Sequence, residues 1–166
     1  MAMTSIIIRP IVPSDNPLIA RIIRDSLTEF GANKPGTVFY DETTDHLYAL
    51  FQEKHSAYFI AEKDGEILGG GGIFPSPGLP EGTCELVKMY LRPEARGTGT
   101  GAALINRCME TAVGFGFIQM YIETMPELTK AITVYEKFGF HYLKGPLGNT
   151  GHFGCGVWML KDLVQA

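Results

Sequence analysis

The sequence predicts an α/β fold in a single domain that spans residues 1–166: a mixed sheet flanked by helices. Three observations support this prediction. Hydrophobic residues make up 45% of the chain and charged residues 19%, which is typical of a globular protein with a substantial core. Segments with strand and helix periodicity follow one another in the order β-α-α-β-β-β-α-β-α-β-β. Finally, no linker, internal repeat or low-complexity tract divides the chain.

The N-terminal part is expected to form one short strand and two helices. Three consecutive isoleucines predict the strand at residues 6–8. Ser14 is a good N-cap and Pro17 suits a first turn, so the first helix is expected at about 15–30. A shorter helix is expected at 45–54, and its inward-facing residues should be Leu47, Leu50 and Phe51.

A hairpin should follow. Strands at 57–63 and 66–74 are separated by Asp64-Gly65, a dipeptide that supplies the positive φ angles of a tight hairpin turn. The run of four glycines at 69–72 interrupts the second strand, which indicates a bulge or a very close neighbour at that point.

A strand–helix–strand unit is expected next. The strand at 83–91 leads through a glycine-rich segment into a helix that starts after Gly99 and ends at Gly114. The strand at 117–123 is almost wholly apolar, as expected when both of its faces are covered. We expect the two strands of this unit to pair in parallel through a right-handed crossover.

The C-terminal part should add one helix and two antiparallel strands. The helix opens at Pro126 and ends before Gly139, and its apolar face carries Leu128, Ala131, Ile132, Tyr135 and Phe138. Short strands are expected at 140–143 and 155–161, with a glycine-rich loop between them.

Charge and composition argue against several classes of function. The net charge is −4 and no basic stripe is present, so we expect no nucleic-acid partner. No apolar run is long enough to span a membrane and no signal-peptide pattern is present, so we expect a cytoplasmic protein without a membrane partner. Cys84, Cys108 and Cys155 lie far apart without a C-x-x-C pair, which predicts neither disulfides nor a metal site.

The glycine-rich segment at 96–101, RGTGTG, is a candidate anion site. Glycines at alternate positions let backbone N–H groups at a helix start approach a pyrophosphate closely. A Walker P-loop is excluded because no Gly-Lys-Ser or Gly-Lys-Thr occurs. A dinucleotide fingerprint is matched loosely by Gly97, Gly99 and Ala102 with Glu123 as the acid, although only about 40 residues remain for further βαβ units. An ordinary capping loop is the third alternative, but it needs only one glycine.

Two segments resemble the GNAT superfamily, the Gcn5-related N-acetyltransferases. Its motif A is similar to residues 91–101, LRPEARGTGTG, and its later Y-E-K-x-G-F segment is similar to residues 135–140, YEKFGF. The predicted order of elements also matches the family from end to end. The resemblance implies a mixed, mostly antiparallel sheet with one parallel, splayed strand pair. It also implies N-acetyltransferase activity with acetyl-CoA as cosubstrate.

The resemblance further implies where acetyl-CoA binds. Its pantetheine arm would pair with backbone groups in the gap between the splayed strands, and its pyrophosphate would lie on the glycine-rich segment, where Arg96 would add positive charge. Thr124 stands near the place where many relatives carry a cofactor-binding asparagine. The implied cofactor-binding residues are Met89, Tyr90, Leu91, Arg96, Gly97, Thr98, Gly99, Thr100, Gly101, Ala102, Thr124 and Ala131.

Two catalytic residues are implied as well. Glu85 matches the place of the glutamate base in family members that use one, and it would act through water. If no bulge intervenes, strand alternation would put Glu85 on one face with Val87 and Met89. Tyr135 matches the family tyrosine that donates a proton to the departing CoA thiolate, and the backbone N–H of Met89 would stabilise the oxyanion. The plainer alternatives are a solvent-facing glutamate and a core tyrosine.

The acceptor is expected to be a primary amine on a small molecule or peptide. Carboxylates and aromatic residues at 28–45 suit a cationic amine, although a solvated acidic loop is an equal alternative. His152 near Cys155 is more simply explained by loop packing than by catalysis or metal binding. A non-catalytic acyl-CoA-binding regulatory module on the same fold is the competing function, and a homodimer is compatible with the apolar last strand.

Overall fold

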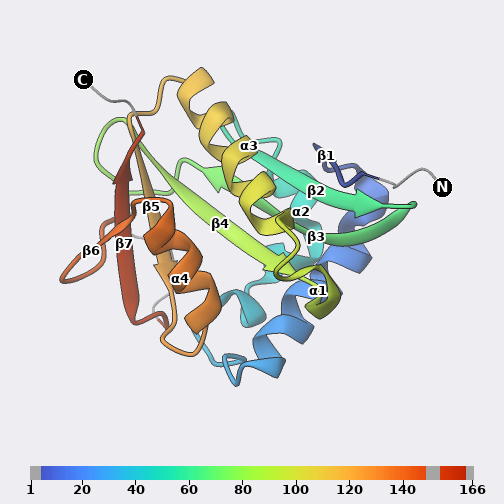
Figure 1. The fold of residues 1–166 in the computed structure, drawn as a ribbon. Helices are drawn as coiled ribbons and strands as arrows, with labels where there is room; N and C mark the ends of the chain where they lie inside the picture. Colours follow the sequence, from blue (N-terminus) through green and yellow to red (C-terminus); the bar gives the residue numbers. More distant parts are fainter. Residues whose placement is uncertain (1–4, 149–153, 164–166) are drawn as a thin grey trace.

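A computed structural model describes residues 5–148 and 154–163, and it shows a seven-stranded mixed sheet with helices on both faces (Figure 1). The strand order is β1-β2-β3-β4-β5-β7-β6, and the one parallel pair among these neighbours in the described residues is β4–β5. This confirms the predicted mixed, mostly antiparallel sheet. The strands are β1 (Ile7–Pro10), β2 (Ala57–Lys63), β3 (Glu66–Phe74), β4 (Thr83–Leu91), β5 (Gln119–Thr124), β6 (His141–Tyr142) and β7 (Val157–Asp162).

The helix α1 (Asn16–Glu29) forms close to its predicted bounds, but Ser14 is not its N-cap. Pro13–Asp15 forms a 3-10 turn instead, and Asp15 takes the cap position without a side-chain cap bond. The Asp15 carboxylate is used elsewhere: it accepts hydrogen bonds from the Arg9 guanidinium and from the Val12 N–H.

The second predicted helix is much shorter than expected. Two 3-10 turns at Val38–Tyr40 and Glu42–His46 precede α2 (Leu47–Leu50), which is a single turn. His46 leaves the helical region with φ −131° and ψ 45°, so the helix cannot begin at residue 45. The inward packing was predicted correctly, since Leu47 and Phe51 are buried and Leu50 packs against the same core.

The hairpin of β2 and β3 is confirmed, with Asp64 and Gly65 both at positive φ as a tight turn requires. Two of the four glycines at 69–72 make room for Tyr58 on β2. A Cβ on Gly70 would lie 2.6 Å from the Tyr58 ring, and one on Gly72 would lie 2.7 Å from it. The missing side chains therefore make room for the tyrosine, whose hydroxyl reaches across to β4 and donates to the Lys88 carbonyl at 2.7 Å.

The helices α3 (Thr100–Gly114) and α4 (Thr129–Lys137) complete the fold. Helix α3 begins and ends where expected, and the left-handed residue that follows its end is Gly116, at φ 93°. Helix α4 begins later than Pro126, because Leu128 has the non-helical angles φ −90° and ψ 56° and closes a turn with Met125.

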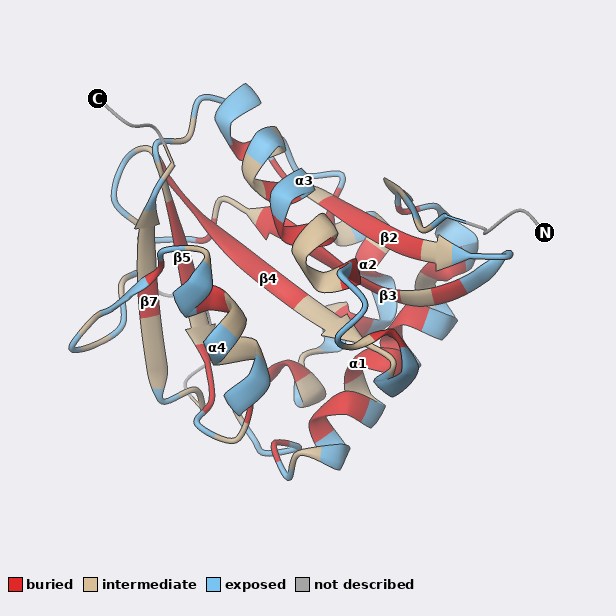
Figure 2. Ribbon diagram, in the orientation of Figure 1, coloured by how far each residue is buried: buried red, intermediate tan, exposed pale blue. Residues whose placement is uncertain are grey.

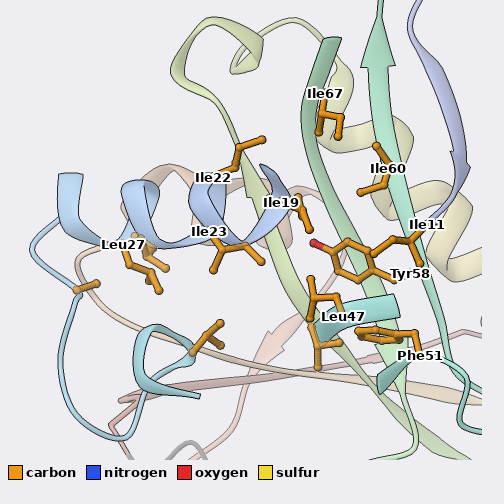
Figure 3. Close-up of a cluster of buried hydrophobic side chains, with 14 of the residues drawn as sticks. Ile11, Ile19, Ile22, Ile23, Leu27, Leu47, Phe51, Tyr58, Ile60 and Ile67 are labelled. Carbon is orange, nitrogen blue, oxygen red and sulfur yellow. The ribbon is translucent and has the colours of Figure 1, made fainter. Parts of the chain in front are cut away.

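Each face of the sheet carries its own apolar layer. Helices α1 and α2 cover one face, where Ile19 and Ile23 pack with Tyr58 and Leu47 (Figure 3). Helices α3 and α4 cover the other, where Leu104 and Ile105 pack on central strands that are buried along most of their length (Figure 2). The remaining buried members of this second layer include Cys108, Ala112, Met120, Tyr135 and Met159.

A bulge in β4 corrects the predicted strand alternation. Gly70 faces Tyr90 and Gly72 faces Val87, so Lys88 and Met89 together stand opposite Gly71. Lys88 has φ 51°, in the left-handed region. Because of the extra residue, Met89 packs in the α3 layer while Val87 stays in the α1 layer. Met89 therefore does not share the face of Glu85 and Val87.

The parallel pair β4–β5 separates soon after it begins. Register pairs join Thr83–Glu85 to Gln119–Tyr121, whereas the remainder of β4 and the end of β5 have no register partner in each other. Figure 1 shows the two strands meeting at one end and diverging toward α4. The predicted splayed pair is thus present, and backbone groups along both inner edges are left without a strand partner.

Candidate active site

A cavity of about 480 Å³ opens where β4 and β5 separate, and we call it the cleft. Its first wall is β4, which contributes Glu85, Met89, Tyr90 and Leu91 among the sequence-predicted site residues. The opposite wall comes from β5 and α4 and includes the predicted residues Thr124, Ala131 and Tyr135.

The glycine-rich segment closes one end of the cleft, with Gly97, Gly99, Gly101 and Ala102 in its lining. Gly97 and Gly99 have φ values of 74° and 87°, and a Cβ on either would meet nothing within 4 Å. Backbone conformation, rather than packing, therefore requires these glycines. The first amides of α3 lie next to this open surface, which is the arrangement that binds anions at helix N-termini.

Thr98 and Thr100 are the two predicted residues that do not line the cleft. The Thr98 hydroxyl donates to the Ala95 carbonyl at 2.5 Å and lies 2.8 Å from the Thr100 hydroxyl, which is fully buried. Their side chains bind the loop to itself and hold its shape.

Arg96 lines the cleft but is strongly engaged within the protein. It forms an ion pair with Glu29, donates to the Leu91 carbonyl at 3.0 Å and stacks 4.8 Å from the centre of the Phe30 ring. The guanidinium thus ties α1 to the end of β4. An anion bound in the cleft would therefore share the positive charge of Arg96 with Glu29.

Glu85 is buried, with 3% of its surface exposed, and it lines the cleft. The Ser76 hydroxyl donates to its Oε1 at 2.5 Å. The predicted alternative of a solvent-facing glutamate is therefore wrong. The carboxylate instead sits inside the molecule, at the point where the two strands begin to part.

Tyr135 is buried at 6% exposure and packs edge-on against Phe140, 6.0 Å between ring centres. It lines the cleft, and no hydrogen bond links its hydroxyl to any residue in the described ranges. Burial raises the pKa of this phenol well above its ordinary value of 10.0, and the nearby Cys108 raises it further. The hydroxyl therefore stays protonated at neutral pH and has a proton to donate.

Glu123 lies across the cleft from Glu85, and sequence reasoning gave it no role in this fold. The Tyr121 hydroxyl donates to its Oε2 at 2.7 Å and accepts from the Leu147 N–H at 3.0 Å. Tyr121 is fully buried, so this carboxylate is held by a rigid partner. The cleft thus contains two carboxylates on neighbouring strands.

Three of the four acidic residues at 28–45 are paired with cations inside the protein. Asp41 pairs with Lys88 at 3.2 Å, Asp45 with Arg24 at 2.5 Å, and Glu29 with Arg96. These pairs neutralise the charge that suggested a cationic acceptor in the sequence.

Three lysines in the cleft lining were missed by sequence reasoning: Lys88 on β4, and Lys130 and Lys137 on α4. Two of the three had a signal in the sequence, since Lys88 interrupts an apolar strand and Lys137 lies inside the YEKFGF segment. Cys155 also lines the cleft, and burial raises the pKa of its thiol to about 12. His152 lies outside the described residues.

Within residues 5–148 and 154–163, no three His, Cys, Asp or Glu side chains gather as a metal site would. None of the helices described there has both the length and the apolar character needed to cross a membrane.

Comparison with known proteins gives consistent matches. The model of the acetyltransferase (GNAT) family matches residues 20–140. A protein of Escherichia coli K12, named N-acetyltransferase YjgM, is 42% identical over 165 residues, which are 98% of each chain.

Solved structures match the fold over nearly the whole chain. A GNAT-family acetyltransferase from Staphylococcus aureus Mu50 superposes with a TM-score of 0.82 at 17% identity, covering 96% of this chain and all of that one. The yncA protein of Salmonella typhimurium, solved with its cofactor acetyl-CoA, gives a TM-score of 0.74 at 16% identity and covers 97% and 95% of the two chains.

Proposed function

Because the chain belongs to the acetyltransferase (GNAT) family, we propose that it transfers the acetyl group of acetyl-CoA to a primary amine on a small molecule or peptide. The observation that supports this most directly is the joint position of three features. The splayed pair β4–β5, the open glycine-rich segment and two buried proton-transfer candidates, Glu85 and Tyr135, all border one cleft.

The residues present fit acetyl-CoA. Residues 86–91 of β4 and 122–124 of β5 have no register partner in each other, so backbone groups on their facing edges, other than the Lys88 and Leu91 carbonyls that Tyr58 and Arg96 already bind, could pair with the amides of a pantetheine arm. Gly97 and Gly99 leave open surface beside the first amides of α3, where a pyrophosphate would bind. Lys130 and Lys137 add positive charge to the opposite wall, and they suit the third phosphate of CoA, the one that is not part of the pyrophosphate.

The chain's own residues then carry out the proton transfers. Bound acetyl-CoA supplies the activated thioester. Glu85 takes a proton from the acceptor amine through water as the new C–N bond forms, and the backbone N–H of Met89 donates to the carbonyl oxygen as it gains charge. Tyr135 gives its proton to the sulfur as the C–S bond breaks. The amine loses one proton and the thiolate gains one, so the reaction balances.

The bulge favours Met89 for this donor role, because the register of β3 passes over Lys88 and Met89. A backbone N–H at such a position is not tied into a regular ladder and is positioned before the reaction.

The competing function is an acyl-CoA-binding module without turnover. A thiol-release assay with acetyl-CoA and a panel of primary amines separates the two, with CoA binding measured by calorimetry on the same preparation. We expect amine-dependent thiol release. Tight CoA binding without release for every amine would instead support the module.

A further inference from the structure

We propose that Lys88 selects the acceptor, and that the acceptor is a primary amine that also carries a carboxylate, as amino acids do. This inference deepens the proposed function and rests on it. It starts from the bulge in β4, which the transfer reaction itself uses only through the backbone of Met89.

The bulge determines where Lys88 points. In a regular strand, Lys88 would share the face of Leu86, which packs in the α3 layer. With φ at 51°, the chain instead directs the lysine toward the loop between α1 and α2, where its ammonium meets Asp41. A lysine in the left-handed region is uncommon, and such strained residues gather at functional sites.

Other residues hold this conformation in place. The buried Tyr58 hydroxyl donates to the Lys88 carbonyl at 2.7 Å, and the glycines of β3 make room for the tyrosine. The buried Tyr58 and the glycines of β3 thus both support the conformation of this one lysine.

The Lys88 ammonium has donor capacity to spare. Its side chain is 3% exposed, and Asp41, at 3.2 Å, is the one hydrogen-bond partner that the described residues give it. An ammonium carries three N–H donors, and buried donors normally find acceptors. Asp41 is also shared, because its Oδ1 accepts from the backbone N–H and the hydroxyl of Thr43.

The ion pairs around Lys88 balance its charge, so a ligand carboxylate would bind through its spare N–H donors. Arg24, Asp45, Asp41 and Lys88 form a cluster of two cations and two anions, which is neutral as a whole. Glu85 on β4 and Glu123 on β5 are carboxylates in the same cleft, and they suit the ammonium form in which the amine arrives, before it loses a proton to solvent and becomes the nucleophile. A ligand that directs an amine toward Glu85 and a carboxylate toward Lys88 is therefore complementary to both charged groups.

The remaining wall favours an apolar substituent. Val38, Val87, Met125 and Leu128 line the cleft and belong to the buried layer under α1. Amino acids with apolar side chains therefore fit this end of the cleft better than polyamines or sugars.

The test compares matched amines: leucine against isopentylamine, and phenylalanine against phenethylamine. For the natural sequence we expect kcat/KM to be roughly 10- to 100-fold higher for the carboxylated partner, the usual range for a charge-assisted hydrogen bond. In Lys88→Met and in Lys88→Gln, which keeps a donor toward Asp41, this ratio should fall close to one. Lys63→Met, an exposed lysine on the hairpin, should leave the ratio unchanged.

Equal rates for both partners with the natural sequence would overturn the inference. So would an equal loss for both partners in the Lys88 variants, which would mean that Lys88 only supports the fold; melting temperatures identify a variant that is merely unstable. Binding of the same amines to CoA-saturated protein is measured by calorimetry. Lys88-dependent binding of the carboxylated amine without turnover would support the acceptor assignment and refute the proposed transfer.

Discussion

The Ser76 hydroxyl donates a 2.5 Å hydrogen bond to Oε1 of Glu85, and both side chains are buried. The bond holds the carboxyl group in place at the point where β4 and β5 begin to part.

Glu85→Gln should therefore lower kcat by about 10²–10⁴-fold, the usual contribution of a general base. CoA affinity should hardly change, because the glycine-rich segment and the strand edges are intact. Steady-state kinetics and calorimetry check both numbers. Glu81→Gln, an exposed glutamate just before the same strand, is the matched control and should leave kcat unchanged. Full activity in Glu85→Gln would refute its role as base.

Tyr135→Phe should lower kcat by about 10²-fold or more while leaving the fold stable, since a phenylalanine suits the same apolar surroundings. Because burial raises the pKa of Tyr135, loss of its proton should not depress the rate of the natural enzyme until well above pH 10. A pH–rate profile tests this directly. Tyr142→Phe removes a hydroxyl that bonds Glu136 on the surface, and it should have no effect on the rate.

Gly99→Ala should weaken CoA binding and cost about 1–2 kcal/mol of folding free energy, since φ is 87° at this position. Gly114→Ala adds the same methyl group at the other end of helix α3, outside the cleft lining, where the new Cβ would meet nothing within 4 Å. The second variant should keep its affinity and be slightly more stable. Thermal melts and CoA titrations compare the two, and equal affinity in both would contradict the anion site.

Tyr58→Phe should lower the free energy of unfolding by about 1–3 kcal/mol, because it leaves the buried Lys88 carbonyl without its hydroxyl donor. Chemical denaturation measures the loss. Tyr40→Phe serves as the control, since Tyr40 is 60% exposed, and it should stay within about 0.5 kcal/mol of the natural protein.

Asp15→Asn should cost about 1–3 kcal/mol at neutral pH and progressively less in acid. Burial alone would raise the pKa of Asp15, but hydrogen bonds from Arg9 and the Val12 N–H outweigh it and lower the pKa below its ordinary 3.8. The carboxylate therefore stabilises the fold above pH 3.8, and this contribution disappears as the pH falls through the lowered value. Urea unfolding at several pH values should show the two proteins converging below about pH 4.

Local chemistry made much of the fold predictable. The order of elements followed from short stretches of sequence that are each compatible with few structures. These are the Asp64-Gly65 turn, the apolar run of β5 and the glycine before α3. The ends of α2 and α4 were not predictable in this way. They depend on backbone angles at His46 and Leu128, and on contacts such as the Tyr48 N–H with the side chain of Asn16, 32 positions away.

The main error in the predicted site was the regular alternation of β4, which the bulge interrupts, and the reason is similar. Alternation follows from the sequence of a single strand. The extra residue at Lys88, in contrast, is supported by Tyr58 on β2 and by the glycines of β3. The glycine run did predict an irregularity, but it lies on β3 and could not say which facing residue would be displaced.

The brief pairing of β4 with β5 gives the molecule a mechanical weak point. Three consecutive register pairs join a four-stranded half to a three-stranded half, and the cleft lies along the rest of that boundary. Amide protons near Ile122 should therefore exchange with solvent faster in the free protein than in the loaded one. Resistance to proteases should rise with the supply of cosubstrate, which would link the lifetime of the polypeptide to the metabolic state of its surroundings.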